Sequence, residues 1–544
     1  MAQSHDWRWS YGLTSNDPES FHALAVDHND GTICTVGDAE NSGIQIGPIN
    51  LLDQDQGLLI KHDPWGNIVW YTPIGGSDQE TAENIAIGPT GTIYVTGAFT
   101  GSCYFYNAGS AVVAQTLTSF SGSKDIYLAA FSPDGVVQWA LQFGNGNDEF
   151  YPNVAADDEG VTLLAAYRGS LTSGSTSSSN LLSTGNYNLF NIRVDLTGTQ
   201  QWMMTGGSSG NDTPANIAAD GSRIYLGYVP GGSNFRWYGA GNTLIRNTNS
   251  TPGDHVYLAL NKSGAWVWTS IVTDPSDEVE GYPNIVADCS GVYIASTIGG
   301  SSTLADGTVL SNANRQMYVA RLNPVTGVYN WSRTAAFNSG GSYATPRDID
   351  IGPGGIVHVA GTYKGSPNVL GQSFTNASND DVFLLTLNSD GSYNTHSTII
   401  ASNDQYLSGV AADKFGGIAI CGNFKDALNV PGHSLTGPGN DNGFIAFAQH
   451  GPREPFSEGR ANFNVPVSVC AGTSVDLTTW LRPRTVGAVV DVPFSNAVVD
   501  PNNVIGAMDN LSAQLPGGTG SMLLDFGTTV PQGEVIRIRW RRAS

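Results

Sequence analysis

Residues 84–97 read NIAIGPTGTIYVTG and residues 125–141 read DIYLAAFSPDGVVQWAL, and these two stretches decide the fold. They contain four short runs rich in β-branched and aromatic residues, which we call strands a, b, c and d in chain order. Strands c and d are joined by Ser132-Pro133-Asp134-Gly135, which is typical of a tight turn between antiparallel strands. The unit therefore predicts a four-stranded antiparallel sheet.

The same unit recurs along most of the chain. A tryptophan in strand d returns at intervals of 61 to 69 residues, at Trp9, Trp70, Trp139, Trp202, Trp268 and Trp331, and a seventh copy near His396 lacks it. Strand a carries an apolar residue in every copy, at Leu24, Ile85, Val154, Ile217, Ile285, Ile349 and Val410. A small residue such as Ala86 or Ala155 usually follows it. Small side chains suit strands that converge on a channel, so the repeat predicts an all-β, seven-bladed β-propeller with strand a innermost.

The two ends of the repeat region complement each other. The first strand of the chain, Trp7 to Tyr11, is of type d and precedes its own blade. The last set of strands ends with Gly443 to Phe447 and lacks a strand d. We therefore expect the N-terminal strand to complete the seventh blade, which closes the ring and leaves no open sheet edge at that point.

On these residues the chain resembles the bacterial SBBP repeats, a β-propeller family common in secreted and surface proteins of Bacteroidota-like bacteria. The resemblance rests on Asn84-Ile85-Ala86, Gly91–Gly97, Asp125–Ala129, Pro133-Asp134-Gly135 and Trp139, and covers roughly residues 5 to 450. It implies a propeller fold and export. It implies no reaction, because the shared residues are structural and a fold does not fix a function.

The chain divides after the repeats. Residues 1–451 form the predicted propeller, and residues 452–460, with Pro452 and Pro455, form a predicted linker. Residues 461–544 contain short alternating runs that predict a small β-sandwich. Val469 to Leu477 is similar to the first strands of Ig-like modules, so we expect an Ig-like domain there.

Charge and composition exclude several classes of protein. The net charge is −23, and no long loop carries the cluster of Lys and Arg that a nucleic-acid surface needs. No apolar run is long enough for a membrane-spanning helix, so we expect no membrane insertion. The start Met1-Ala2-Gln3-Ser4 lacks a signal peptide. Our hypothesis is that Met1 replaces a removed signal and that the protein is secreted or displayed at the cell surface.

Acidic residues recur between strand d and the next strand a. Six copies carry one, at Asp17, Asp78, Asp148, Asp212, Asp277 and Asp404, and the remaining copy has Ser342. Such regularity favours a short acceptor that bonds loop amides in each blade. The alternative is a ring of carboxylates that holds Ca²⁺. The five cysteines lack metal-ligand spacing, so we expect no cofactor, with calcium as the one alternative left open.

Two other groups are candidate binding residues. A polar ring is expected at the channel mouth, from Asn84, Asn153, Asn216, Asn284 and Asp348 near the start of strand a. It either reads a polar ligand or satisfies backbone groups at the inner ends of the blades. Aromatic residues occur in two b–c connections, at Tyr104, Phe105 and Tyr106 and at Phe235, Arg236, Trp237 and Tyr238. They suit a sugar or a protein interface, or they fix the loop to the blade edge.

The pattern favours binding over catalysis. The nine histidines are scattered, and no nucleophile elbow or metal-binding histidine motif is present. Acidic pairs such as Asp148-Glu149 and Asp277-Glu278 suit a glycosidase only if their carboxyls are suitably spaced. We therefore expect an extracellular interaction or adhesion protein that binds a protein or glycan at the cell surface. The alternatives are a lectin or glycoside hydrolase, and an architectural subunit of a surface assembly.

Overall fold

The computed structural model of the chain describes most of residues 5–449. The gaps within this range are residues 16, 40–44, 47–48, 51–55, 77, 174–175, 180–185, 275–280, 289, 305, 338–340, 376 and 414–415. Beyond residue 449, only residues 461–464, 474–476, 497–498, 523–525 and 535–540 are described.

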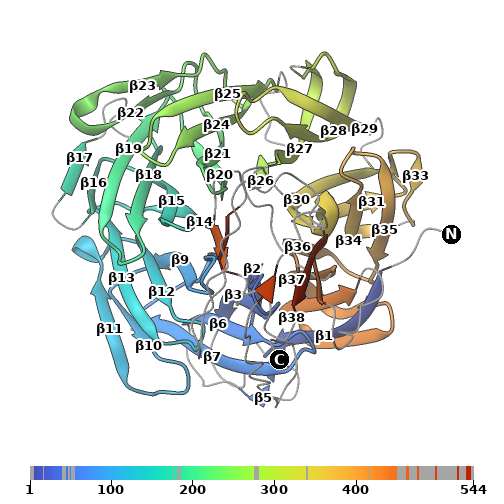
Figure 1. Cartoon of the computed structure of the whole chain (residues 1–544), viewed down its shortest axis with the longest axis horizontal. Helices are drawn as coiled ribbons and strands as arrows, with labels where there is room; N and C mark the ends of the chain where they lie inside the picture. Colours follow the sequence, from blue (N-terminus) through green and yellow to red (C-terminus); the bar gives the residue numbers. More distant parts are fainter. Residues whose placement is uncertain are drawn as a thin grey trace.

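Seven antiparallel sheets stand around a central axis (Figure 1). Each contains four strands in the order a, b, c, d from the axis outward, and four of the sheets carry two further strands beyond strand d. Blades 1 to 3 consist of β2 (Glu19–Val26), β3 (Ile33–Ala39), β6 (Gln56–His62) and β7 (Ile68–Gly76); β8 (Asn84–Ile87), β9 (Ile93–Phe99), β12 (Asp125–Phe131) and β13 (Val137–Gly144); and β14 (Phe150–Ala156), β15 (Gly160–Tyr167), β18 (Asn188–Asp195) and β19 (Gln200–Gly207). The predicted all-β, seven-bladed propeller is confirmed.

The remaining blades follow the same order. They consist of β20 (Thr213–Ala219), β21 (Arg223–Val229), β24 (His255–Asn261) and β25 (Trp266–Val272); β26 (Asn284–Asp288), β27 (Gly291–Thr303), β28 (Val309–Leu322) and β29 (Tyr329–Phe337); β30 (Tyr343–Gly352), β31 (Ile356–Gly365), β34 (Ala377–Leu387) and β35 (Tyr393–Ile399); and β36 (Gln405–Ala412), β37 (Gly417–Val430), β38 (His433–Gln449) and β1 (Asp6–Thr14).

Blade 7 takes its outermost strand from the start of the chain, as the sequence predicts. Strand β1 pairs antiparallel with β38, with Tyr11 opposite Ile445 and Leu13 opposite Gly443. Leu13 is fully buried. The first and last strands of the repeat region therefore join in one sheet, and the ring closes without a disulfide.

The core lies between the blades. Every residue of β9 and of β12 is buried, because both faces of these middle strands are covered by neighbouring sheets. One cluster combines Val36 and Leu59 of blade 1 with Val95 and Tyr127 of blade 2. Packing of sheet against sheet, repeated around the ring, distributes the apolar burial that a chain of this length cannot gather in one core.

The repeated tryptophan joins each blade to the next. The indole N–H of Trp70 on β7 donates to the carbonyl of Pro133, 3.1 Å away, in the c–d turn of blade 2. The Trp70 ring covers Gly135, whose φ is 77° and where a Cβ would lie 3.1 Å from the ring. The same bond joins Trp9 to Pro64, Trp139 to Leu196, Trp202 to Lys262, Trp268 to Pro324 and Trp331 to Ser389.

The loss of the seventh tryptophan has a structural reason. Blade 7 has no c–d turn, because its strand d comes from the N-terminus, so the residue at this position in blade 6 has no such turn to cover. This residue, His396, stacks on Phe374 with ring centroids 4.8 Å apart. His5, just ahead of β1, hydrogen bonds instead to Ser397 at 2.7 Å. The N-terminal segment thus takes over this junction.

Several b–c connections are hairpins that widen the preceding blade. Strands β10 (Ser102–Tyr106) and β11 (Val113–Thr118) belong to blade 2 in sequence but extend the sheet of blade 1 through β7. The other hairpins that do this are β4 (Gln45–Ile46) with β5 (Ile49–Asn50), β16 (Ser170–Ser173) with β17 (Thr176–Ser179), and β22 (Arg236–Tyr238) with β23 (Leu244–Asn247). They lie along the outer rim, on the face where the b–c and d–a connections open.

The described C-terminal strands form two small sheets. The first contains β39 (Ala461–Asn464), β43 (Val535–Trp540) and β41 (Ala497–Val498), and the second contains β40 (Ser474–Asp476) and β42 (Leu523–Asp525). The predicted linker 452–460 and most of the predicted Ig-like sandwich lie outside the described residues.

Candidate functional site

The seven innermost strands line a channel of about 540 Å³ along the propeller axis. Side chains of a strand alternate between its two faces, so Ile85 points into the core between blades, while Asn84 and Ala86 on either side of it line the channel. The same alternation in every blade gives the channel a wall of amides, small residues and a few charged groups.

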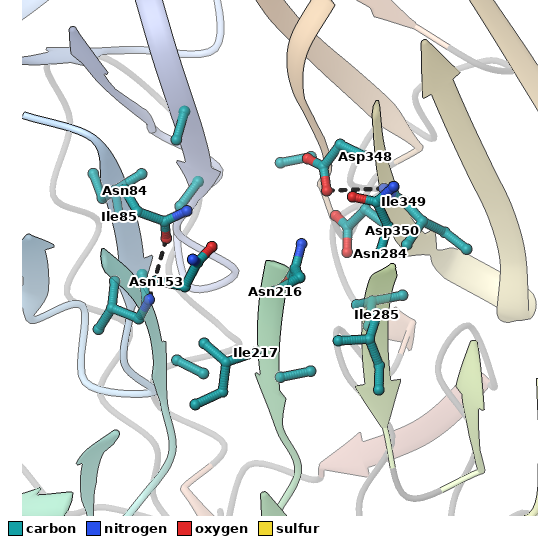
Figure 2. A pocket seen from close by; sticks show the side chains of 18 of the residues that line it. Asn84, Ile85, Asn153, Asn216, Ile217, Asn284, Ile285, Asp348, Ile349 and Asp350 are labelled. Atoms are coloured by element: carbon teal, nitrogen blue, oxygen red, sulfur yellow. Dashed lines mark hydrogen bonds between the residues drawn. The ribbon is translucent and has the colours of Figure 1, made fainter. Parts of the chain in front are cut away.

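All five residues of the predicted polar ring lie in this one channel. Figure 2 shows Asn84 and Asn153 on one side and Asn284 and Asp348 on the other, with Asn216 between them. The positions come from five different blades, so the repeat geometry alone brings them together. The five residues therefore line one channel, and their role in binding stays a prediction.

Some members of the ring also join neighbouring inner strands. The Asn84 Oδ1 accepts a hydrogen bond from the Val154 backbone N–H at 3.4 Å. The Asp348 carboxylate accepts one from the Val410 N–H at 2.8 Å. Each bond crosses from one blade to the next. These side chains therefore satisfy backbone groups at the inner ends of the blades, which is the structural alternative to ligand binding. The two roles are compatible, because an amide or carboxylate has further hydrogen-bonding positions.

A second carboxylate, Asp350, lines the channel beside Asp348, and the sequence analysis missed it. It accepts a hydrogen bond from the Ala412 N–H at 2.7 Å. Burial raises the pKa of both carboxyls to about 7, against the opposing effect of the backbone hydrogen bonds. The sequence could have identified it, because Asp350 follows Ile349, the apolar residue of strand a, where most blades have a small residue.

Two tyrosines at the channel mouth were also missed. Tyr151 and Tyr282 line the channel and are 59% and 46% exposed. Each begins the sequence Tyr-Pro-Asn, in blades 3 and 5. The Asn153 amide donates to the Tyr151 carbonyl at 3.0 Å, and the Asn284 amide donates to the Tyr282 carbonyl at 3.2 Å. The repeated tripeptide could have identified them from the sequence.

The backbone of Tyr151 is unusual. Its φ is 57°, in the left-handed region that non-glycine residues rarely adopt and that is often found at functional sites. This conformation belongs to the irregular pairing of β14 with β15 between Phe150 and Asn153.

Two of the recurring acids between strands d and a, Asp148 and Asp404, bond the amide of a residue at the start of strand c. Asp148 accepts from the Lys124 N–H at 2.9 Å, and Asp404 accepts from the Asp380 N–H at 3.0 Å. In blade 3 the matching acceptor is Asn211, which bonds the Tyr187 N–H at 3.0 Å. The alignment of Asp212 with these residues was therefore wrong by one position.

The other acids of that set differ in their surroundings. Asp212 bonds Ser208 and the Gly231 N–H instead. Asp17 and Asp78 lie in described connections, whereas Asp277 lies outside the described residues. Within the described part of the chain, no three His, Cys, Asp or Glu side chains gather closely enough to hold a metal ion.

One pair of acids is buried inside blade 2. Asp125 and Glu149 are fully buried, and a Cβ added to Gly144 would lie 2.4 Å from the Asp125 Oδ1 and 2.8 Å from the Glu149 Oε2. Burial, followed by the charge of Asp125, raises the pKa of Glu149 to about 9, and burial raises that of Asp125 to about 6. Two carboxyls this close favour the form in which one keeps its proton. Glu149 does not reach the surface, whereas a glycosidase acid must contact its substrate.

Three of the predicted loop residues are not exposed, and the role of the group in binding stays a prediction. Phe105, Phe235 and Trp237 are fully buried, because the b–c connections are hairpins whose alternate residues face the core. Phe105 packs edge-on against Tyr127 at 5.3 Å. Trp237 donates its indole N–H to the Tyr228 hydroxyl at 3.3 Å. These three residues fix the hairpins to the blades, which is the structural alternative that we gave for the loop aromatics.

The intervening residues of the same hairpins reach the surface. Tyr104, Tyr106 and Tyr238 are half-buried and Arg236 is exposed. Of the seven predicted residues, these four form what we call the rim set. They alternate with buried anchors, so their backbone is held by the sheet.

Comparison with known proteins finds distant similarity. No protein-family model matches the chain. The regulatory protein FlaEY of Caulobacter vibrioides is 23% identical over 369 residues, which is 64% of this chain and 36% of FlaEY. The uncharacterized WD repeat-containing protein L264 of Acanthamoeba polyphaga mimivirus is 23% identical over 182 residues, which is 32% of this chain and 13% of L264. The chain thus spans about a third of FlaEY and less of L264.

A solved structure, the quinohemoprotein alcohol dehydrogenase ADHIIG of Pseudomonas putida HK5, aligns with 85% of this chain and 79% of its own, with a TM-score of 0.34 and 11% identity. In the described part of the chain, no helix is long and apolar enough to cross a membrane. The propeller fold, together with the distant similarity to a regulatory protein and a WD repeat-containing protein, is consistent with a binding or interaction role.

Proposed function

We propose that this chain is a non-catalytic binding protein that engages a protein partner through the outer rim of the face where the b–c hairpins open. The observation that carries the proposal is the rim set, Tyr104, Tyr106, Arg236 and Tyr238. Tyrosine and arginine are the residue types that most often dominate binding energy at protein interfaces. Held on hairpins that are anchored by Phe105 and Trp237, they lose little conformational entropy on binding.

Export to the cell exterior is part of the proposal. It draws support from the SBBP resemblance, and the C-terminal Ig-like module would then space or anchor the propeller at the surface. The names of the two curated relatives, a regulatory protein and a WD repeat-containing protein, are consistent with a role in binding. Fractionation of source cells, with detection of the protein in the surface or medium fraction, tests the location.

Calcium binding by the acids between strands d and a stays a separate proposal. The hydrogen bonds of Asp148 and Asp404 to loop amides occupy one oxygen of each carboxylate, which leaves oxygens that a hard cation can use. Titration of the full chain with calcium in a calorimeter tests it, and the absence of heat would reject it.

The test of the partner site uses matched variants of the full chain. Wild type should retain a protein from the surface fraction of source cells, and the double variant Tyr104→Ala/Arg236→Ala should lose it by tenfold or more. Leu196→Ala is the control, because Leu196 is 44% exposed in a c–d turn on the opposite face. Equal retention by the double variant and the wild type would reject the rim as the partner site.

A further inference from the structure

A second candidate site lies at the channel mouth, away from the rim set. Blades 3, 4 and 5 present one continuous arc of the channel mouth, which we call the shelf. It consists of Tyr151 and Asn153 on β14, Asn216 on β20, Asn284 at the start of β26, and Tyr282 just before that strand. Prolines 152 and 283 lie between the tyrosine and the asparagine in two of the three blades and restrict the backbone that carries them.

The hydrogen bonds of the shelf leave defined groups for a ligand. Asn153 and Asn284 each use the amide nitrogen to bond the carbonyl of the preceding tyrosine, so their amide oxygens are held in place as acceptors. Asn216 lies between them, and no hydrogen bond to its side chain is present among the described residues. It therefore offers both an NH₂ donor and a carbonyl acceptor. Figure 2 shows its amide standing in the open channel.

The chemistry of the shelf selects its ligand. The shelf residues carry no charge, whereas the charged residues of the channel lie on other strands, with Glu83 preceding β8 and Arg347, Asp348 and Asp350 on β30. Donors and acceptors in alternation match hydroxyl groups, which both give and accept hydrogen bonds. The exposed tyrosine rings supply apolar faces on which a sugar ring stacks. A channel of about 540 Å³ is within the range of small-molecule sites.

We propose that the shelf binds a neutral, hydroxyl-rich ligand, the terminal sugars of an uncharged glycan. Asn216 bonds two hydroxyls at the centre of the site, the amide oxygens of Asn153 and Asn284 accept from hydroxyls on either side, and Tyr151 or Tyr282 covers the ring face. The proposal goes beyond the partner site on the rim, which uses different residues.

The test begins with an array of neutral and acidic oligosaccharides probed with the labelled full chain. The wild type should bind neutral glycans, and calorimetry with the best of them should give the affinity. Asn216→Leu keeps the branched outline of the side chain and removes both hydrogen-bonding groups, so the affinity should fall at least tenfold. Tyr151→Ala should weaken binding as well. Leu196→Ala and Tyr104→Ala/Arg236→Ala should bind the glycan as the wild type does.

Other outcomes overturn the proposal. The proposal is wrong if the wild type binds no neutral glycan or binds only acidic glycans. It is also wrong if a folded Asn216→Leu variant binds with wild-type affinity. Melting temperatures establish that the variants are folded, and if Asn216→Leu does not fold, Tyr282→Ala replaces it under the same criteria. The two proposals can fail separately. If Asn216→Leu retains the protein partner and the rim variant loses it, the rim proposal is supported, regardless of the result with glycans.

Discussion

At the scale of single residues, blade 2 contains a buried pair of acidic side chains. The buried acids Asp125 and Glu149 lie close together beside Gly144. The raised pKa of Glu149, about 9, means that the folded protein keeps this proton while the unfolded chain, with a pKa near 4.5, has lost it. The pair therefore opposes folding more strongly as the pH rises from about 5 to about 9.

The variant Glu149→Gln tests this at the residue scale. Glutamine keeps the acceptor for the Asn145 amide and supplies a fixed donor toward Asp125. Stability of the wild type should fall with rising pH by up to about 1.4 kcal/mol per unit, and the variant should lose much of this slope. Urea unfolding at pH 5.5, 7 and 8.5 measures both, and parallel slopes would show that Glu149 is not a protonated acid.

At the scale of elements, the junction between blades is the repeating unit of stability. Trp268 is 5% exposed and donates its indole N–H to the Pro324 carbonyl at 3.0 Å, while its ring covers the c–d turn at Gly327. Both the packing and the hydrogen bond join blade 4 to blade 5. Because the bond reaches a turn of the next blade, its loss should weaken the ring as a whole.

Graded substitution of Trp268 separates the two contributions. Trp268→Phe keeps a ring and loses the bond, at a cost of about 1 kcal/mol, and Trp268→Ala loses both, at about 3–5 kcal/mol. Trp65→Ala is the control, because Trp65 is 45% exposed and its removal should change stability by less than about 0.5 kcal/mol. Denaturant midpoints measure all three, and a Trp268→Ala midpoint equal to that of Trp65→Ala would contradict the role of the junction.

At the scale of the molecule, closure by β1 makes the ring one cooperative body. Removal of residues 1–14 would expose the edge of β38, and an unpaired edge recruits other strands. We expect the shortened chain to self-associate and to melt at a lower temperature. Size-exclusion chromatography with light scattering and thermal melting measure this, and a synthetic peptide of residues 5–14 should reverse both changes. A monomeric shortened chain with an unchanged melting temperature would contradict closure.

Features that repeat along the chain could be predicted from the sequence, and contacts between different blades could not. The blades and their closure were predictable, because the apolar residue of strand a recurs in every unit and the strand-d tryptophan recurs in six of the seven. The channel ring was predictable for the same reason, since residues on either side of a buried position such as Ile85 face the axis. The burial of Phe105 and Trp237 was not, because it arises from pairing of a b–c hairpin with another blade, and nothing local marks that partner.

The claim that the rim set binds a protein partner is tested most directly by photo-crosslinking in source cells. A photoreactive amino acid replaces Arg236 in one version of the full chain and Leu196, on the opposite face, in another. The proposed function predicts a discrete crosslinked partner from position 236 and none from position 196. Crosslinks from position 196 alone, or from neither position, would contradict it.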